Sequence, residues 1–365
     1  MRALHIHVGP MALNHIRQHG LSPEHIGVMP AAAGGPKGLI LGPLDRFNFG
    51  EWLPQSRQPV DLVGASIGAW RMATACLNHP VAAFERLEHD YIHQHYEPLP
   101  GQKRVTAQQV SEAFGQSLDA FYGGRVAQLL KHDRYRLHLV TSHGRHILHR
   151  EHPLLTPLGY AGAYLSNAVH RKALGAWLER VVFSAEQGDT LPVLPFDSSD
   201  FRTRQVALTE GNFMSALQAS CAIPFALKAV HDIPGGPTGA YWDGGITDYH
   251  LHLKWSAPQK GTERALVLYP HFQKNVVPGW LDKALKWRHG ATSFLDRTIV
   301  LAPNPEWVKT LPNGKLPDRQ DFMVYRDDLG ARVKVWQTAA RASAQLADEW
   351  AQWLDQPDLS ILMPI

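Results

Sequence analysis

Residues 60–70 read VDLVGASIGAW, and this stretch decides the fold. Its first four residues have the composition of a buried strand, and the residues from 67 to 75 have that of a helix. The G-A-S-I-G between them matches the strand-to-helix turn that exposes a nucleophilic serine, here Ser66. Because such a turn brings backbone segments very close together, Gly64 and Gly68 supply the small residues it requires. The alternative is a plain tight turn in which Ser66 only caps the helix.

A second strand-like run at 26–33 leads into a glycine-rich turn before a helix start. Backbone N–H groups in such a turn can bind an anion, and acyl transfer needs such donors for its oxyanion. Pro36 has no N–H, so the donors would come from Gly34, Gly35, Lys37 or Gly38. The turn matches neither nucleotide-binding glycine pattern, which disfavours a phosphate loop. Because the two turns follow successive strands, we expect them side by side at the carboxyl edge of the sheet.

Further along, AYWDGG at 240–245 reads as a strand that ends in Asp243 and two glycines. The glycines permit a sharp turn and the close approach of another segment. Taken alone, an Asp-Gly pair is a common turn and carries no function.

The order of these motifs resembles the patatin-like phospholipase family over about residues 26–250. A fourth motif, QASCAIP at 218–224, is similar to the family's small-residue segment before the aspartate. The resemblance implies a dyad in which Ser66 attacks an acyl ester and Asp243 accepts its proton. It matches Gly34, Gly35 and Lys37 to the family's oxyanion loop and requires no metal or cofactor. It also implies a three-layer α/β/α sandwich with a central, mostly parallel sheet.

Three departures from the family pattern bear on substrate geometry more than on chemistry. Ala33 replaces the first glycine of the usual loop, Pro36 precedes the lysine, and Ile246 begins the segment after Asp-Gly-Gly, where the family often has Asn-Pro. A carboxylate near its ordinary pKa of about 4 is a weak base at neutral pH. We therefore expect Asp243 to lie in a poorly solvated pocket that raises its pKa.

The rest of the chain alternates short β-branched runs with helical patterns, as α/β proteins do. A helix at 106–122 begins with a Thr106/Gln109 capping box and stops at Gly123, and a second, amphipathic helix covers 331–355. Residues 80–130 form either a cap over the site or a plain surface layer. We predict one domain over 1–365, with a C-terminal helical region at about 320–365. The predicted strands are 2–7, 26–33, 60–65, 135–142, 180–185, 201–209, 264–269 and 297–302.

Composition sets the remaining expectations. The 365 residues are 44% hydrophobic and carry a formal charge of +3 with both signs interspersed, which is not a nucleic-acid footprint. Cys76 and Cys221 lie in apolar stretches, which favours buried thiols and a cytoplasmic location. The chain has neither a signal-peptide core nor a stretch of about 18 apolar residues, so peripheral contact is the expected form of membrane association. His89 and His93 could share a helix face, and a solvated face is favoured there over a metal site.

Other functions stay open at this point. An α/β-hydrolase triad could use Ser66 and Asp243 with His250, His252 or His271. An acyltransferase would pass the acyl group to an acceptor other than water. A non-enzymatic, membrane-associated binding protein could use the tryptophans of 277–289 at a lipid surface, although core packing is favoured for them. The favoured function is hydrolysis of an acyl ester of a lipid, such as a phospholipid or lysophospholipid.

Overall fold

The computed structural model describes residues 1–188, 190–256 and 266–365. Its central sheet has the strand order β11-β1-β10-β9-β2-β3-β4-β5-β6. From β10 to β4 all neighbours are parallel, whereas β1–β10 and β4–β5 are antiparallel. The bounds are β1 Leu4–Val8, β2 Ile26–Ala31, β3 Val60–Ala65, β4 Tyr135–Gly144, β5 Leu178–Ala185, β6 Thr203–Leu208, β7 Val230–His231, β8 Ala240–Asp243, β9 Leu266–Pro270, β10 Thr298–Pro303 and β11 Leu362–Pro364.

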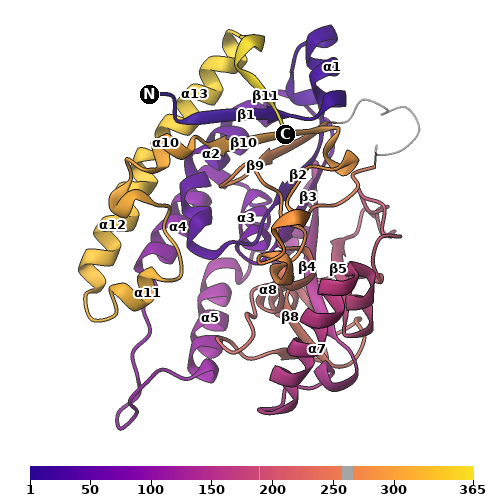
Figure 1. The fold of residues 1–365 in the computed structure, drawn as a ribbon, viewed down its shortest axis with the longest axis vertical. Coiled ribbons are helices and arrows are strands. Elements are labelled where there is room, and N and C mark those ends of the chain that lie inside the picture. The colour runs from indigo at the N-terminus through magenta and orange to yellow at the C-terminus, as the bar shows by residue number, and fades with distance from the viewer. Residues whose placement is uncertain (189, 257–265) are drawn as a thin grey trace.

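Helices cover both faces of the sheet and complete the predicted three-layer α/β/α arrangement (Figure 1). The helices α4, α5, α12 and α13 lie on one side of the molecule, and α7 lies on the other. The bounds are α1 Pro10–His19, α2 Gly42–Phe47, α3 Ile67–Ala75, α4 Pro80–His93, α5 Ala107–Tyr122, α6 Val126–Leu130, α7 Leu155–Val169, α8 Phe213–Ser220, α9 Gly245–Asp248, α10 Pro305–Val308, α11 Asp321–Val324, α12 Leu329–Ala342 and α13 Ala344–Asp355.

Strand β3 shows how the sequence divides between the two apolar layers. Val60 and Leu62 belong to the large cluster that includes side chains of α3 and α13. Val63 and Ala65 belong to a second cluster, formed on the opposite face. Successive side chains of a strand point to opposite faces, so a strand buried on both faces reads as one continuous apolar run.

The predicted strands are confirmed with end shifts of a few residues, except that residues 264–265 lie outside the described part. The predicted helix at 106–122 is confirmed as α5, in which Thr106 Oγ1 accepts a hydrogen bond from the Gln109 amide at 3.2 Å. The single helix predicted over 331–355 is wrong. It is broken at Ser343, whose buried hydroxyl donates to the Ala340 carbonyl at 2.6 Å.

The segment 277–289 matches the expectation of tryptophans packed in the core only in part, because Trp280 packs against two buried apolar clusters and Trp287 does not. It contains two short 3-10 turns, Trp280–Asp282 and Lys286–Arg288. Trp280 is half-buried, whereas Trp287 is 73% exposed. The spacing of the tryptophans misled the prediction because no regular helix forms here to place them on one face.

Two further observations concern the thiols and the membrane. Cys76 and Cys221 are both free and buried. In the described part of the chain, no helix combines the length and the apolar character needed to cross a bilayer.

Candidate active site

Strand β4 acts as the template that brings the two predicted site residues together. Its residue Val140 pairs with Ala65, the last residue of β3. The next residue, Thr141, pairs with Asp243, the last residue of β8. The short strand β8 therefore occupies the edge of β4 just beyond the point where β3 stops. This register places Ser66 and Asp243 next to each other.

The turn at Ser66 has the strained geometry that the sequence predicts. Ser66 has φ 57° and ψ −128°, a region that residues with a side chain rarely adopt. A Cβ on Gly64 would lie 2.5 Å from Ala69 Cα, and one on Gly68 would lie 1.9 Å from the Ala31 carbonyl oxygen. The two glycines are therefore required by close backbone approach. The turn presents the Ser66 side chain at the N-terminus of α3.

The hydroxyl of Ser66 donates a hydrogen bond of 2.7 Å to Asp243 Oδ2. The other carboxylate oxygen, Oδ1, accepts from the Gly245 amide at 2.7 Å. Both residues are buried, with exposures of 3% for Ser66 and 5% for Asp243. Burial raises the pKa of Asp243, although Arg319 and the hydrogen bond from Ser66 partly oppose this. The carboxylate is therefore a stronger base than an exposed aspartate.

The segment 219–224 is hydrogen-bonded to the backbone of both the turn at Ser66 and the turn at Asp243. The Ser66 amide donates to Ser220 Oγ at 3.0 Å, and that hydroxyl donates to the Val140 carbonyl at 2.7 Å. The Asp243 amide donates to the Ala222 carbonyl, and the Gly244 amide donates to that of Ser220. One small-residue segment thus fixes the backbone of Ser66 and of Asp243 together.

The glycine-rich loop borders the same site. It forms a 3-10 helix, Gly35–Leu41, which contains Lys37 and Gly38. Among the residues that the structure describes, neither the Gly34 nor the Gly35 amide donates a hydrogen bond. Gly35 lines a cavity together with Ser66. The Gly35 amide is therefore unbonded at the wall of the cavity that contains Ser66. The Lys37 ammonium lies 5.3 Å from the centre of the Phe272 ring.

The cavity at Ser66 has a volume of about 940 Å³. Apolar side chains, among them Ile67, Trp70, Val110, Phe114 and Leu227, form much of its wall. Residues 94–98 and 103–105, which connect α4 to α5, form part of the wall, as do residues of the segment 319–332. Part of the region 80–130 therefore borders the candidate site.

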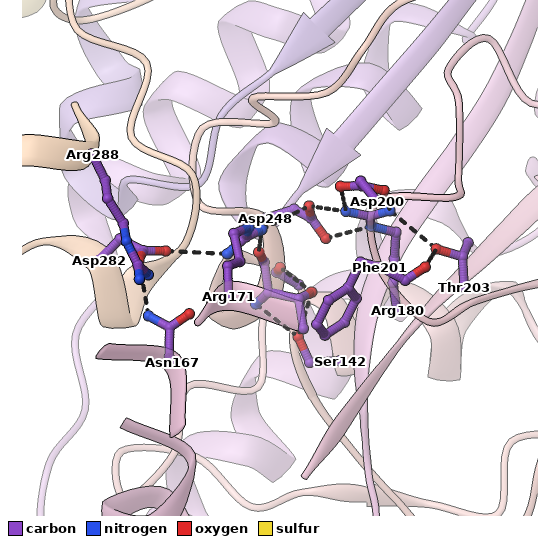
Figure 2. Close-up of polar contacts among 12 residues, drawn as sticks. Ser142, Asn167, Arg171, Arg180, Asp200, Phe201, Thr203, Asp248, Asp282 and Arg288 are labelled. Atoms are coloured by element: carbon purple, nitrogen blue, oxygen red, sulfur yellow. Dashed lines mark hydrogen bonds and ion pairs between the residues drawn. The ribbon is translucent and has the colours of Figure 1, made fainter. Parts of the chain in front are cut away.

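A buried ionic network holds the helix that follows Asp243 (Figure 2). Asp248, at the end of α9, accepts hydrogen bonds from Arg180 Nε at 2.7 Å and Nη2 at 2.6 Å. Burial alone would raise the pKa of Asp248, but the Arg180 guanidinium lowers it below its usual value. Nearby, Asp282 receives hydrogen bonds from Asn167 and Arg288 and pairs with Arg171. The network fixes the orientation of α9 and so of the turn at Asp243.

The three histidines considered for a triad have other partners. His250 Nδ1 accepts from the Val277 amide, His252 Nε2 contacts the Thr292 hydroxyl, and His271 Nδ1 contacts the main chain of Gln273. In residues 1–188, 190–256 and 266–365, no hydrogen bond joins any of the three to Ser66 or Asp243.

Sequence reasoning missed several residues at the site. Arg319 lines the cavity, and Lys283 lines a small pocket with Asp243. Both lie in loops far from the motifs along the chain, and no sequence signal connects them to Ser66. Ser220 was part of a recognised motif, but its hydrogen bond to the Ser66 amide is visible only in three dimensions.

The predicted solvated face at His89 and His93 carries two stacked rings, with centroids 4.2 Å apart. Within the described residues there is no group of three or more histidine, cysteine, aspartate or glutamate side chains suited to hold a metal ion.

Comparison with known proteins gives little further information. No family model matches the chain, and no curated protein matches it. Among solved structures, the chain is similar to VipD from Legionella pneumophila, with 14% sequence identity and a TM-score of 0.37. The match covers 95% of this chain and 70% of that one. At this level of similarity, the site must be judged from its own geometry.

Proposed function

We propose that the chain is a serine hydrolase that cleaves carboxylic acyl esters of lipids through an acyl-enzyme on Ser66. The observation that carries the proposal is the 2.7 Å hydrogen bond from Ser66 Oγ to the buried Asp243 carboxylate. The strained turn at Ser66 supports it, since such strain gathers at functional sites. The order of the four motifs, which resembles the patatin-like family, points to the same chemistry.

In the proposed reaction, Asp243 accepts the Ser66 proton while Oγ attacks the ester carbonyl. The amides of Gly34 and Gly35 bind the negative charge that develops on the carbonyl oxygen. Asp243 then returns the proton to the leaving alcohol. In the second half, Asp243 takes a proton from water as the water oxygen attacks the acyl-enzyme. Asp243 then passes that proton to Ser66 Oγ as the acid is released, which restores the free enzyme. The raised pKa of Asp243 suits both proton transfers.

The apolar side chains that line the cavity favour a lipid acyl chain as the bound part of the substrate. The side chains of Ile67, Trp70 and Phe114 line it close to Ser66 and offer an apolar wall to a hydrocarbon chain. The partners of His250, His252 and His271 favour the dyad over a triad. Transfer to an acceptor other than water would use the same acyl-enzyme, and product analysis with added alcohols separates it from hydrolysis.

We also propose that α7 contacts the lipid surface from which the substrate is taken. The helix has no charged residue, and Leu158, Leu165 and Val169 are 61%, 65% and 87% exposed. Its Tyr160 ring lies 5.9 Å from that of Phe225, which is 61% exposed with φ 68°. Phe225 follows Pro224, which lines the pocket at Asp243. Exposed apolar side chains therefore lie both on α7 and next to the pocket at Asp243, as interfacial binding requires.

The membrane proposal is tested by sedimentation with liposomes. The Ser66→Ala protein should sediment, and Leu165→Ser with Phe225→Ser in that background should remain in the supernatant. The matched control Met11→Ser changes an exposed apolar residue on α1, outside this surface and outside the cavity, and should sediment normally. Sedimentation of the double variant equal to its parent would contradict the role of α7.

Hydrolysis is tested with 4-nitrophenyl esters of increasing chain length. The wild-type protein should cleave them, with longer chains preferred, and Ser66→Ala and Asp243→Asn should each lose at least about 1,000-fold in kcat/KM. His250→Asn and His271→Asn should retain catalysis by folded protein. Loss of all activity in one folded histidine variant would overturn the dyad.

A further inference from the structure

One charged side chain is buried in the wall of the cavity that contains Ser66. Arg332, the fourth residue of α12, lines this cavity and is only 4% exposed. The other acidic and basic residues that the structure describes in this wall are all exposed; they are Glu97, Lys103, Arg104, Arg319, Arg326 and Asp327. The charge of Arg332 is therefore shielded from solvent, unlike theirs.

The guanidinium of Arg332 has no acidic partner. Within the part of the chain that the structure describes, its one hydrogen bond runs from Nη2 to the Gln94 carbonyl, and its Nε is buried without any partner. Desolvation lowers the pKa of Arg332, and the negative charge of Asp321 only partly offsets this. The Asp321 carboxylate is itself occupied, because it pairs with Lys315 at 2.8 Å and accepts from Trp336 Nε1 at 2.9 Å. Buried charges are rarely left unpaired, so this one calls for a function.

Aromatic rings hold this guanidinium in place. Its Cζ lies 4.5 Å from the centre of the Phe322 ring and 4.9 Å from that of Trp336. Cation–π contacts stabilise a cation without neutralising it. Arg332 also lies near the N-terminus of α12, where the helix dipole favours negative charge. A fixed and unneutralised guanidinium at this end of a helix is suited to bind an anion.

Aromatic side chains show where this charge lies relative to Ser66. Helix α4 packs on both α3 and α12 (Figure 1). The ring of Tyr91 on α4 lies 6.1 Å from that of Trp70, one turn after Ser66, and 6.3 Å from that of Trp336, beside Arg332. Ser66, Trp70, Tyr91 and Arg332 line the same cavity. One elongated ligand can therefore contact both the nucleophile and the buried charge.

We propose that Arg332 binds a carboxylate carried by an aliphatic chain inside this cavity. One guanidinium has one positive charge, which matches a carboxylate, and the side chains of Ile67, Trp70 and Phe114 match the chain. Two ligands have this chemistry: an acyl ester whose chain ends in a carboxylate, and a free fatty acid, such as the product of hydrolysis. The proposal rests on the proposed function for the presence of an acyl chain at Ser66, whereas the carboxylate site depends on Arg332 alone.

The test measures binding to the Ser66→Ala protein, which needs no turnover. Monomethyl and dimethyl esters of suberic, sebacic and dodecanedioic acids are titrated, because the two esters of each acid differ by one carboxylate. For at least one length, the monomethyl ester should bind at least about 10-fold more tightly, since a charge-assisted hydrogen bond is worth about that factor. Adding Arg332→Gln should remove this preference by weakening only the monomethyl ester. Arg332→Lys, which keeps the charge, should retain part of it.

Two exposed cations provide matched controls. Arg341→Gln changes an arginine of α12 outside the cavity, and Lys103→Gln changes an exposed lysine of the cavity wall. Neither should alter the preference for the monomethyl ester, and its loss in Lys103→Gln with retention in Arg332→Gln would contradict the assignment to Arg332. Thermal unfolding of each variant verifies that it is folded.

Decanoic acid and decanol distinguish the two ligands. A preference for decanoic acid that Arg332→Gln removes would assign the site to free fatty acids. A preference confined to monomethyl esters of one length would assign it to the far end of an acyl chain.

Equal affinity for the charged and the neutral ligand in every pair would overturn the proposal, whether or not the Arg332 variants fold. So would an equal loss of affinity for charged and neutral ligands in Arg332→Gln, because Arg332 would then only hold the loop at Gln94. Failure of Ser66 as a nucleophile would leave the preference for the carboxylate intact. The two failures are thereby distinguished.

Discussion

The Ser66 amide donates a hydrogen bond of 3.0 Å to the hydroxyl of Ser220, a residue 154 positions further along the chain. The same hydroxyl donates to the Val140 carbonyl on β4, so it links the strained turn to the sheet. Ser220 touches none of the proposed reacting atoms. We infer that it is a positioning residue for Ser66.

Ser220→Ala should therefore lower kcat by about 10-fold with little change in KM, because loss of one buried partner costs about 1–3 kcal/mol. Ser220→Thr, which keeps a hydroxyl, should recover part of the loss. Ser215→Ala on the same helix removes a hydroxyl bonded to the Asn212 carbonyl and is the control. A rise in KM with kcat unchanged would contradict the positioning role.

We expect the protonation of Asp243 to determine the acidic limb of the pH profile of kcat/KM. Only its ionised form can accept the serine proton, so kcat/KM should fall as the pH drops through its pKa. Because burial raises that pKa, the limb should lie above the pH expected for an ordinary aspartate. Arg319 opposes the rise, so Arg319→Gln should move the limb to still higher pH. The profile is measured with a neutral 4-nitrophenyl ester. If the acidic limb lies at the same pH in Arg319→Gln as in the wild-type protein, the assignment of this limb to Asp243 is contradicted.

The buried pair of Arg180 and Asp248 predicts a large effect on stability. Asp248→Asn leaves the Arg180 charge without its closest partner and should lower the free energy of unfolding by about 3–5 kcal/mol. Asp200 also bonds Arg180 but is more exposed, so Asp200→Asn should cost clearly less. Urea unfolding of both variants measures the difference. Equal costs would show that Asp248 is not the dominant partner.

His250 and His271 predict a loss of stability in acid. Burial lowers the pKa of His271 to about 3 and that of His250 well below its usual value. In the unfolded chain both take up a proton near pH 6.5, well above the pH at which they do so in the folded protein. Lowering the pH therefore stabilises the unfolded state, and the free energy of unfolding decreases. Between pH 7.5 and 5.5 each histidine should account for about 1.4 kcal/mol.

His271→Gln should remove about that share of the difference between the unfolding free energies at the two pH values. The exposed His79→Gln is its control. An unchanged pH dependence in His271→Gln would show that His271 is not neutral in the folded protein.

Local features of the sequence were sufficient to predict helix α5, the turn at Ser66 and the strands other than the short β7 and β11. Their signals lie within a few neighbouring residues, such as the apolar run before Gly64 and the capping pair Thr106 and Gln109. These signals act over the same short range as the hydrogen bonds that form the elements. The sequence also suggested that Ser66 and Asp243 meet, but this came from the order of the motifs.

Long-range features could not be predicted in this way. The register of β8 on β4 depends on pairing between residues about 100 positions apart. The positions of Arg319 and Lys283 depend on loops that carry no periodic pattern. The break at Ser343 interrupts a sequence that reads as one amphipathic helix, because α12 packs on α4 while α13 packs on α2 and β1. Tertiary packing decides these features.

Labelling with a fluorophosphonate probe, followed by peptide mapping, tests the central claim most directly. Ser66 should carry the label in the wild-type protein, and Asp243→Asn should slow labelling sharply because the hydroxyl loses its proton acceptor. Ser66→Ala should take up no label at all. Wild-type labelling at another serine, or an unchanged labelling rate in Asp243→Asn, would contradict the account.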